Sequence, residues 1–177
     1  MIGGWKFGTT LVLQSGAPFS ILSSRGTINR VSRSYYNTAV TSLNGAQLQD
    51  VVKFQMTGTG PMMIVPSAIN PQDGSGVNID GQAAFQGQQF FNPDPGNIGT
   101  LQRRMFNSPW LFNMDVSLMK DFKIREGQNL TLRMDAFNAP NHPNFWTGDQ
   151  DINTTVFGVV AASFSSRVMQ FGLRYKF

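Results

Sequence analysis

The sequence predicts an all-β protein, specifically a segment of an antiparallel transmembrane β-barrel with about four long strands, long extracellular loops and one short helix. Three observations predict this fold: apolar and polar residues alternate in four segments, the composition suits strands, and the connections between the segments are very unequal. The composition combines 18 glycines and 15 phenylalanines with only 14% charged residues. That balance favours strands joined by polar connections over a helical protein.

The last segment, at about residues 168–177, alternates up to its final residue. Its apolar positions are Met169, Phe171, Leu173, Tyr175 and Phe177, and its polar positions are Gln170, Gly172, Arg174 and Lys176. Because successive side chains of a strand point to opposite faces, this strand has one apolar face and one polar, cationic face. Chain ends fray unless something holds them. The aromatic end therefore indicates a strand held in the outer membrane of a Gram-negative type of cell.

Three earlier segments alternate in the same way, at about residues 4–14, 109–123 and 129–138. The apolar positions are Trp5, Phe7, Thr9, Leu11 and Leu13 in the first, Trp110, Phe112, Met114, Val116, Leu118 and Phe122 in the second, and Leu130, Leu132, Met134 and Ala136 in the third. A strand that crosses a bilayer at a tilt needs about 9 to 11 residues. Each segment is therefore long enough to span the membrane.

Energetics decide which face of these strands meets lipid. An arginine at the lipid-facing midplane of a barrel costs roughly 2 to 4 kcal/mol, so the polar face must turn toward an aqueous lumen. The side chains that we expect in the lumen are Asp115, Ser117, Asp121, Arg133, Asp135 and Arg174. Lys120 has outward parity, and we expect its long stem to reach the lipid headgroups. Asp121 lies diagonal to Arg133, which predicts an ion pair.

A tight hairpin is predicted between the second and third strands. Residues 125–127, Arg-Glu-Gly, suit a three-residue loop in which the glycine takes the left-handed conformation. In that register Ile124 faces Gln128 and Phe122 faces Leu130, so each pair shares a face of the sheet.

The other connections are long, at residues 20–108 and 139–167. Outer-membrane barrels have short periplasmic turns and long extracellular loops, so we expect both long loops outside the cell. The first loop should contain one short helix, near Gln47 to Phe54, with Asn44 as its cap. Leu48, Val51 and Val52 would share one face of that helix.

Two aromatic girdles are expected at the membrane boundaries. Trp5, Phe122, Tyr175 and Phe177 would form one girdle, and Trp110, Phe112, Phe145 and Trp146 would lie toward the other.

Composition excludes several other classes of protein. Cysteine is absent, which rules out disulfides and thiolate metal sites. No stretch approaches the roughly 18 apolar residues of a membrane helix. The first residues show no secretory signal, so the chain is either cytosolic or a piece of a longer exported protein, and we favour the piece. The net charge of +4 comes with no recognition motif, so no nucleic acid partner is expected. Its loop arginines, Arg25, Arg30, Arg33, Arg103 and Arg104, are interpreted as a solvated surface, with an acidic saccharide as the alternative.

Candidate chemistry is weak along the whole chain. His142 is the only histidine and is interpreted as part of a turn. Asp149, Asp151 and Asn153 imitate the start of a calcium loop, but Thr154 and Val160 stand where glycine and glutamate are required. Asp115 and Asp135 share a face, although no nucleophile accompanies them. Gly58 with Gly60 and Gly74 with Gly76 lack a nucleotide-binding fingerprint and are interpreted as flexible loop positions. We expect no catalytic residue, no metal and no cofactor, and the sequence does not identify a substrate-binding residue.

Four stretches of the sequence resemble the carboxyl-terminal part of Oar-like TonB-dependent receptors. They are GGWKFGTTLVLQSGAPFSI, GNIGTLQRRMFNSPWLFNMDVSLMKDFKI, LTLRMDAFNAPNHPNF and RVMQFGLRYKF, and the FNxxNHPNF element at 137–145 is the most telling. The resemblance implies that residues 1–177 are the carboxyl-terminal portion of a large plugged outer-membrane barrel that is energised through TonB and transports a bulky substrate. It also implies that the apolar positions of the terminal strand form the signal read by the barrel-assembly machinery.

The same resemblance implies what lies outside this chain. Such receptors have a signal peptide, a TonB-contacting segment, a plug and most of their strands ahead of this point, so TonB would be contacted only through missing amino-terminal regions. The partners of this chain would then be outer-membrane lipid and the assembly machinery. A barrel of this class has about 22 strands, and four strands cannot close.

Two alternatives to this interpretation remain open. One is a secreted or surface β-sandwich that buries its apolar faces against each other and binds glycan or protein through the long loops. The other is a homo-oligomer in which four-stranded protomers close one barrel together.

Overall fold

The computed structural model of this 177-residue chain describes residues 3–25 and 36–177. The chain divides into two compact units. The first, here called the strand unit, contains the residues up to Ser15, Trp110–Asn144 and Phe164–Phe177. The second, here called the loop unit, contains Gly16–Pro109 and Phe145–Ser163.

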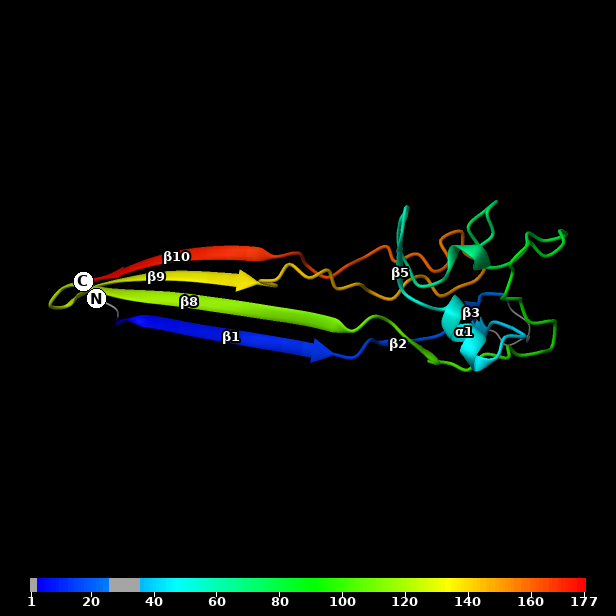
Figure 1. Cartoon of the computed structure of the whole chain (residues 1–177), viewed down its shortest axis with the longest axis horizontal. Coiled ribbons are helices and arrows are strands. Elements are labelled where there is room, and N and C mark those ends of the chain that lie inside the picture. Colours follow the sequence, from blue (N-terminus) through cyan, green and yellow to red (C-terminus); the bar gives the residue numbers. More distant parts are fainter. Residues whose placement is uncertain (1–2, 26–35) are drawn as a thin grey trace. The chain divides into compact units, whose positions relative to one another are not determined.

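The strand unit is built on one antiparallel sheet of four strands, in the order β1-β8-β9-β10 (Figure 1). Its strands are β1 (Trp5–Gln14), β8 (Leu111–Arg125), β9 (Gln128–Phe137) and β10 (Val168–Lys176). Each begins and ends within two residues of the bounds that the alternation predicts. The start of β1 and the end of β10 lie at the same end of the sheet as the β8–β9 turn (Figure 1). The fold class predicted from the sequence is confirmed for the sheet.

The β8–β9 hairpin has the predicted register along most of its length but a different turn. Phe122 pairs with Leu130, as expected. The expected pair of Ile124 with Gln128 is wrong, because Arg125 pairs with Gln128 and the register shifts between Lys123 and Arg125. The turn therefore has two residues, with Gly127 at a φ of +80°. The extra residue on β8 is absorbed as a bulge, which restores the pairing beyond it.

β1 and β10 are the edge strands of this sheet. Each has one partner strand, β8 for β1 and β9 for β10. On the other side of each edge strand, the described part of the chain supplies no partner. Long open edges of this kind are templates for further strand pairing.

The loop unit has a hydrophobic core of its own, although the sequence predicts two long loops. Its short pairs of strands are β2 (Pro18–Phe19) with β7 (Phe106–Asn107), β3 (Leu22–Ser23) with β4 (Asn37–Thr38), and β5 (Gln55–Thr57) with β6 (Gly60–Met62). The core collects Phe19, Ile21, Ala39, Leu48, Met63, Ile64, Ala68, Val77, Phe90, Leu101, Phe106, Ile152, Phe157 and Val160. The last three of these come from the second predicted loop, so the two loops fold together.

The predicted helix is present as α1 (Gly45–Val51), slightly earlier than expected. Asn44 caps it: the Asn44 side chain accepts from the Gln47 backbone, and the Gln47 side chain accepts from the Asn44 backbone. Leu48 is buried, and Val51 and Val52 pack against the core, as predicted. A short 3-10 helix follows at Pro66–Ala68. No described helix has the length and hydropathy that a membrane-spanning helix requires.

Two glycines of the loop unit are packing positions, and their interpretation as flexible loop residues is wrong. Gly74 has a φ of +80°, and a side chain there would meet the carbonyl oxygen of Thr155. A Cβ at Gly76 would lie 2.7 Å from the ring of Phe157, which is fully buried. Both glycines therefore let residues 70–77 approach the segment around Phe157 closely.

We expect Gly76→Ala to destabilise the loop unit by about 1 to 3 kcal/mol, because the added methyl group overpacks against the Phe157 ring. Faster amide hydrogen exchange in residues 145–163 would report the change. Gly58→Ala is the matched control, since a Cβ there would meet nothing within 4 Å. Equal effects of the two substitutions would contradict this account of the core.

Candidate functional site

The pairing of the strand unit sorts its side chains into two faces. One row across the four strands consists of Phe7, Leu118, Met134 and Phe171. The next row toward the turn consists of Trp5, Lys120, Leu132 and Leu173. Lys120 is the one charged residue in these two rows. All the strands therefore present their apolar residues on the same face.

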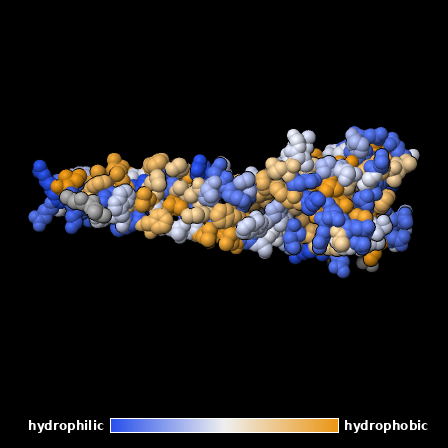
Figure 2. Space-filling view, in the orientation of Figure 1, coloured by the Kyte–Doolittle hydropathy of each residue, from blue (hydrophilic) through white to orange (hydrophobic). Residues whose placement is uncertain are grey.

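This apolar face is open to its surroundings. Phe7 is 67% exposed, Phe171 72% and Leu173 69%, and Leu11 and Leu13 are more than half exposed. Figure 2 shows apolar side chains along the strands. Soluble monomers rarely expose apolar patches of more than a few hundred Å². A row of large exposed side chains on several strands is thus typical of a surface that contacts lipid or a partner.

The opposite face of the sheet carries ion pairs and hydrogen bonds. Lys6 Nζ lies 2.9 Å from Asp121 Oδ2, and Thr131 Oγ1 donates to Asp121 Oδ1 at 2.6 Å. Arg133 Nε donates to Asp135 Oδ2 at 2.7 Å. The expected ion pair between Asp121 and Arg133 is therefore wrong. Each of these groups has a nearer partner on the same face.

Lys120 differs from its expected role. It lies on the apolar face, but only 7% of it is exposed, and its ammonium group donates to the Gly3 carbonyl oxygen at 2.6 Å. The same Nζ atom lies 4.9 Å from the Trp5 ring centroid and 5.5 Å from that of Phe122. Instead of extending outward, the cation is held by a carbonyl oxygen and two aromatic faces.

Aromatic residues gather at the turn end of the sheet. Trp5, Phe122, Tyr175 and Phe177 are all exposed there, and the rings of Tyr175 and Phe177 are 6.1 Å apart. Of the second predicted group, Trp110 is exposed in the strand unit. Phe145 does not belong to a girdle, because it packs against Phe54 at 5.1 Å between centroids and against the core of the loop unit.

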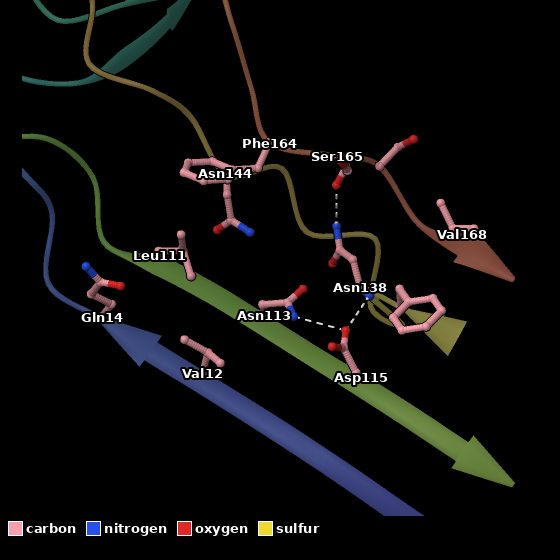
Figure 3. Close-up of a pocket in the computed structure, with 12 residues that line it drawn as sticks. Val12, Gln14, Leu111, Asn113, Asp115, Asn138, Asn144, Phe164, Ser165 and Val168 are labelled. Atoms are coloured by element: carbon pink, nitrogen blue, oxygen red, sulfur yellow. Dashed lines mark hydrogen bonds between the residues drawn. The ribbon is translucent and has the colours of Figure 1, made fainter. Parts of the chain in front are cut away.

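A pocket of about 580 Å³ opens on the polar face, near the ends of β1 and β9 (Figure 3). Polar side chains from several segments line it: Gln14, Asn113, Asp115, Asn138, Asn144, Ser165 and Ser166. Phe137 and Phe164 add aromatic surface to the same walls. All of these residues belong to the strand unit.

Asn138 organises the rim of this pocket. Its backbone φ is +50°, a conformation that asparagine tolerates better than most residues. The Asn138 backbone N–H donates to Asp115 Oδ1 at 2.9 Å, and Nδ2 donates to the Ser165 carbonyl oxygen at 3.3 Å (Figure 3). Nδ2 also donates to the His142 carbonyl oxygen, and Oδ1 accepts from the His142 N–H. One amide therefore ties β9 to the segment that leads into β10.

The Asn144 side chain also joins two segments, through two hydrogen bonds to the backbone of Phe112. Its Oδ1 accepts from the Phe112 N–H at 2.9 Å, and its Nδ2 donates to the Phe112 carbonyl oxygen at 2.8 Å. The His142 ring packs edge-on to Phe112, with 5.5 Å between centroids. His142 is thus held within a turn, in agreement with its interpretation as a turn residue.

Some polar side chains that line the pocket have no hydrogen-bond partner among the described residues. The side chains of Gln14, Ser165 and Ser166 make no hydrogen bond to the described residues, whereas those of Asn138 and Asn144 each take part in three. Amide and hydroxyl groups next to exposed aromatic rings can hydrogen-bond and stack on a neutral polar ligand.

Comparison with known proteins adds the decisive observation. Residues 1–170 match the family described as outer membrane beta barrel domain. The chain belongs to this family. It is an outer-membrane β-barrel protein, located in the cell outer membrane, and its four-stranded sheet is a segment of an antiparallel transmembrane barrel. No match was found among curated proteins or among solved structures.

The sandwich alternative does not fit this barrel protein. A sandwich buries the apolar face of each sheet against a second sheet. In the described strand unit that face is exposed, whereas the ion pairs lie on the other face.

The weaker motifs of this outer-membrane protein are parts of local structure. Asp151 Oδ1 accepts from the backbone N–H groups of Ser24 and Asn153, and Asp149 Oδ1 accepts from Thr154 Oγ1 at 2.7 Å. Asp115 is held by Asn113 and Asn138. Among the described residues there is no group of three or more acidic, histidine or cysteine side chains that could hold a metal ion.

The arginines that suggest an acidic saccharide are not gathered into one described cluster. Arg25 pairs with Asp80 at 3.3 Å, and Arg103 Nη2 donates to the Tyr36 carbonyl oxygen at 2.6 Å. The Arg104 backbone N–H donates to Ser20 Oγ. Arg30 and Arg33 lie outside the described residues.

The pocket itself was missed by the sequence analysis. Its walls come from segments more than 100 residues apart, which no local pattern brings together. The one available signal is the polar turn FNAPNHPNF, in which Asn138 and Asn141 have positive φ angles.

We expect Asn138→Gly to loosen the pocket rim, because glycine keeps the positive φ angle but removes the amide group. The His142 N–H would lose its acceptor and exchange faster with solvent. A typical hydrogen bond contributes about 1 kcal/mol to stability, and the loss should be of that size. Ser165→Ala is the control, since only the Ser165 backbone carbonyl oxygen is used. Unchanged exchange at His142 in Asn138→Gly would contradict the proposed role of this amide.

Proposed function

We propose that this chain forms the carboxyl-terminal strands of the barrel of an Oar-like TonB-dependent transporter, a non-catalytic protein that moves a bulky substrate across the outer membrane. The observation that carries the proposal is where the four resembling stretches fall. They cover β1 and β10, nearly all of β8 and β9, and the FNxxNHPNF turn at the pocket. Family membership supports the barrel and its location, and the resemblance supplies the transporter class.

The apolar face would contact lipid and the polar face would line the lumen. The side chains of Phe7, Phe171 and Leu173 are exposed, which is unfavourable in water. Contact with the hydrocarbon of the membrane removes that cost. The lumen would then receive Asp115, Ser117, Asp121, Arg133, Asp135 and Arg174. A lipid-facing arginine costs roughly 2 to 4 kcal/mol at the midplane, so the reverse orientation is much less stable.

The two edge strands support a larger barrel. Unpaired backbone groups cost several kcal/mol each in hydrocarbon, and β1 and β10 are long edges with nine or ten residues. We infer that further strands of the same polypeptide pair with these edges, as the resemblance implies. Protomers of the same chain that close a barrel together are the second possibility for these edges.

The long connections would serve substrate recognition. We infer that the loop unit faces the outside of the cell and that its core holds the recognition surface in a fixed conformation. The terminal strand, with Met169, Phe171, Leu173, Tyr175 and Phe177 on one face, would be read by the barrel-assembly machinery. TonB would be contacted by regions outside this chain.

Leu173→Arg should abolish assembly of the protein in the outer membrane, because it places a charge in the apolar row opposite Leu132. Gln170→Arg should assemble normally, because Gln170 lies on the polar face opposite Asp135. Heat-modifiable migration of the membrane fraction measures assembly. Equal tolerance of both substitutions would contradict the assignment of faces.

The proposal that the protein is a TonB-dependent transporter is tested separately from the assignment of the lipid and lumen faces. The protein is produced with its upstream sequence in cells with and without TonB, and crosslinking is carried out in vivo. An adduct with TonB is expected, and an in-frame plug and signal peptide should be encoded upstream of Met1. A well-assembled barrel that never crosslinks to TonB would contradict the transporter proposal while leaving the barrel intact.

A further inference from the structure

A second pocket, of about 870 Å³, lies at the turn end of the sheet. Four cations and the Asp121 carboxylate line its walls. Three of the cations, Lys123, Arg174 and Lys176, lie on the polar face of the sheet and are here called the cationic cluster. The neutral side chains of Asn129 and Thr131 line the same pocket. The pocket therefore combines positive charge with hydrogen-bonding groups.

The register places this cluster on one face of three neighbouring strands. Lys123 and Lys176 both pair with Asn129, from opposite sides. In the next row Thr131 lies between Asp121 and Arg174. Neighbouring strands lie about 4.8 Å apart, so the backbones of Lys123 and Lys176 are about 10 Å apart, with Asn129 between them.

The one acid in the pocket wall, Asp121, forms no ion pair with the cationic cluster. In the described part of the chain, no ion pair involves Lys123, Arg174 or Lys176. The nearest acid in the rows is Asp121, and it is already engaged by Lys6 at 2.9 Å and by Thr131. Glu126 in the turn makes no ion pair either. Three positive charges therefore remain uncompensated.

The rest of the polar face makes this cluster unusual. Lys6 and Arg133 each have a carboxylate within 2.9 Å. Cations gathered at one end of a sheet face repel one another, and this repulsion is a cost even with Asn129 between Lys123 and Lys176. A ligand that carries negative charge would remove that cost at the turn end of the sheet.

We propose that the cationic cluster binds a ligand with phosphoryl groups. A phosphoryl monoester carries about −1.5 to −2 charges and three acceptor oxygens, so it can neutralise more than one cation. The Arg174 guanidinium can form two parallel hydrogen bonds to phosphoryl oxygens, and the two ammonium groups act as point charges. The Asn129 amide adds a neutral donor between them. The phosphoryl group can belong to a free anion in the lumen or to a lipid headgroup at the rim of the barrel, where the turn ends the sheet.

Pyrophosphate is the probe for this site. The protein, produced with its upstream sequence and purified in neutral detergent, is titrated with pyrophosphate at low ionic strength, and binding is followed by calorimetry. Arg174→Gln and Lys176→Gln should each weaken binding about tenfold or more, as expected for a lost hydrogen bond to a charged group. Lys53→Gln, which removes a charge from the loop unit, should leave binding unchanged. Lys176→Arg keeps the charge and should retain binding, and circular dichroism checks that each variant is folded.

Vesicles distinguish the sources of the phosphoryl group. If the source is a lipid, vesicles of phosphatidylglycerol bind better than vesicles of phosphatidylcholine, and pyrophosphate competes with them. If it is a free anion, pyrophosphate binds and the two vesicle types behave alike. Either result supports the site.

Three results would overturn the inference. The first is no binding of pyrophosphate to the unmodified, folded protein. The second is an equal loss of affinity in Lys53→Gln and Arg174→Gln, which would indicate attraction to net charge alone. The third is tighter binding of an octaglutamate peptide than of pyrophosphate, which would assign the cluster to an acidic protein segment.

Discussion

The structure depends on one constraint, the shared register of β1, β8, β9 and β10. In this register, apolar residues of neighbouring strands lie side by side, as in the row Phe7–Leu118–Met134–Phe171. A slip of one residue in any strand would move its apolar row to the polar face. The exposed apolar surface, the ion pairs of Lys6 and Arg133, the pocket at Asn138 and the cationic cluster all follow from this register.

Local patterns explain why much of the sheet could be predicted. Alternation with a period of two gave the strand bounds and the pair Phe122–Leu130, and the cap at Asn44 located the helix. The partners of charged side chains were harder to predict, because several oppositely charged or polar groups lie within reach of each charge. Asp121 pairs with Lys6 instead of Arg133, and Lys120 turns to Gly3 and two rings. The bulge at Ile124 depends on how the two-residue turn closes, and alternation does not encode that.

The loop unit could not be predicted for a different reason. Its core joins residues far apart in the sequence, such as Phe90 and Phe157, whose ring centroids lie 5.7 Å apart. Its strands have only two or three residues, too few for a periodic signal. Glycines that look like flexible positions, such as Gly76, are needed for close packing. The pocket on the polar face was missed because its walls combine four segments of the strand unit.

Which face of the strands touches hydrocarbon is the central claim, and the chain is well suited to measure it because it has no cysteine. Single cysteines at positions 169 to 174 of β10, in protein assembled in outer membranes, can carry a fluorophore that is quenched by nitroxide-labelled lipid. The account predicts strong quenching at 169, 171 and 173 and labelling by aqueous reagents at 170, 172 and 174. The opposite alternation, or uniform quenching along the strand, would contradict it.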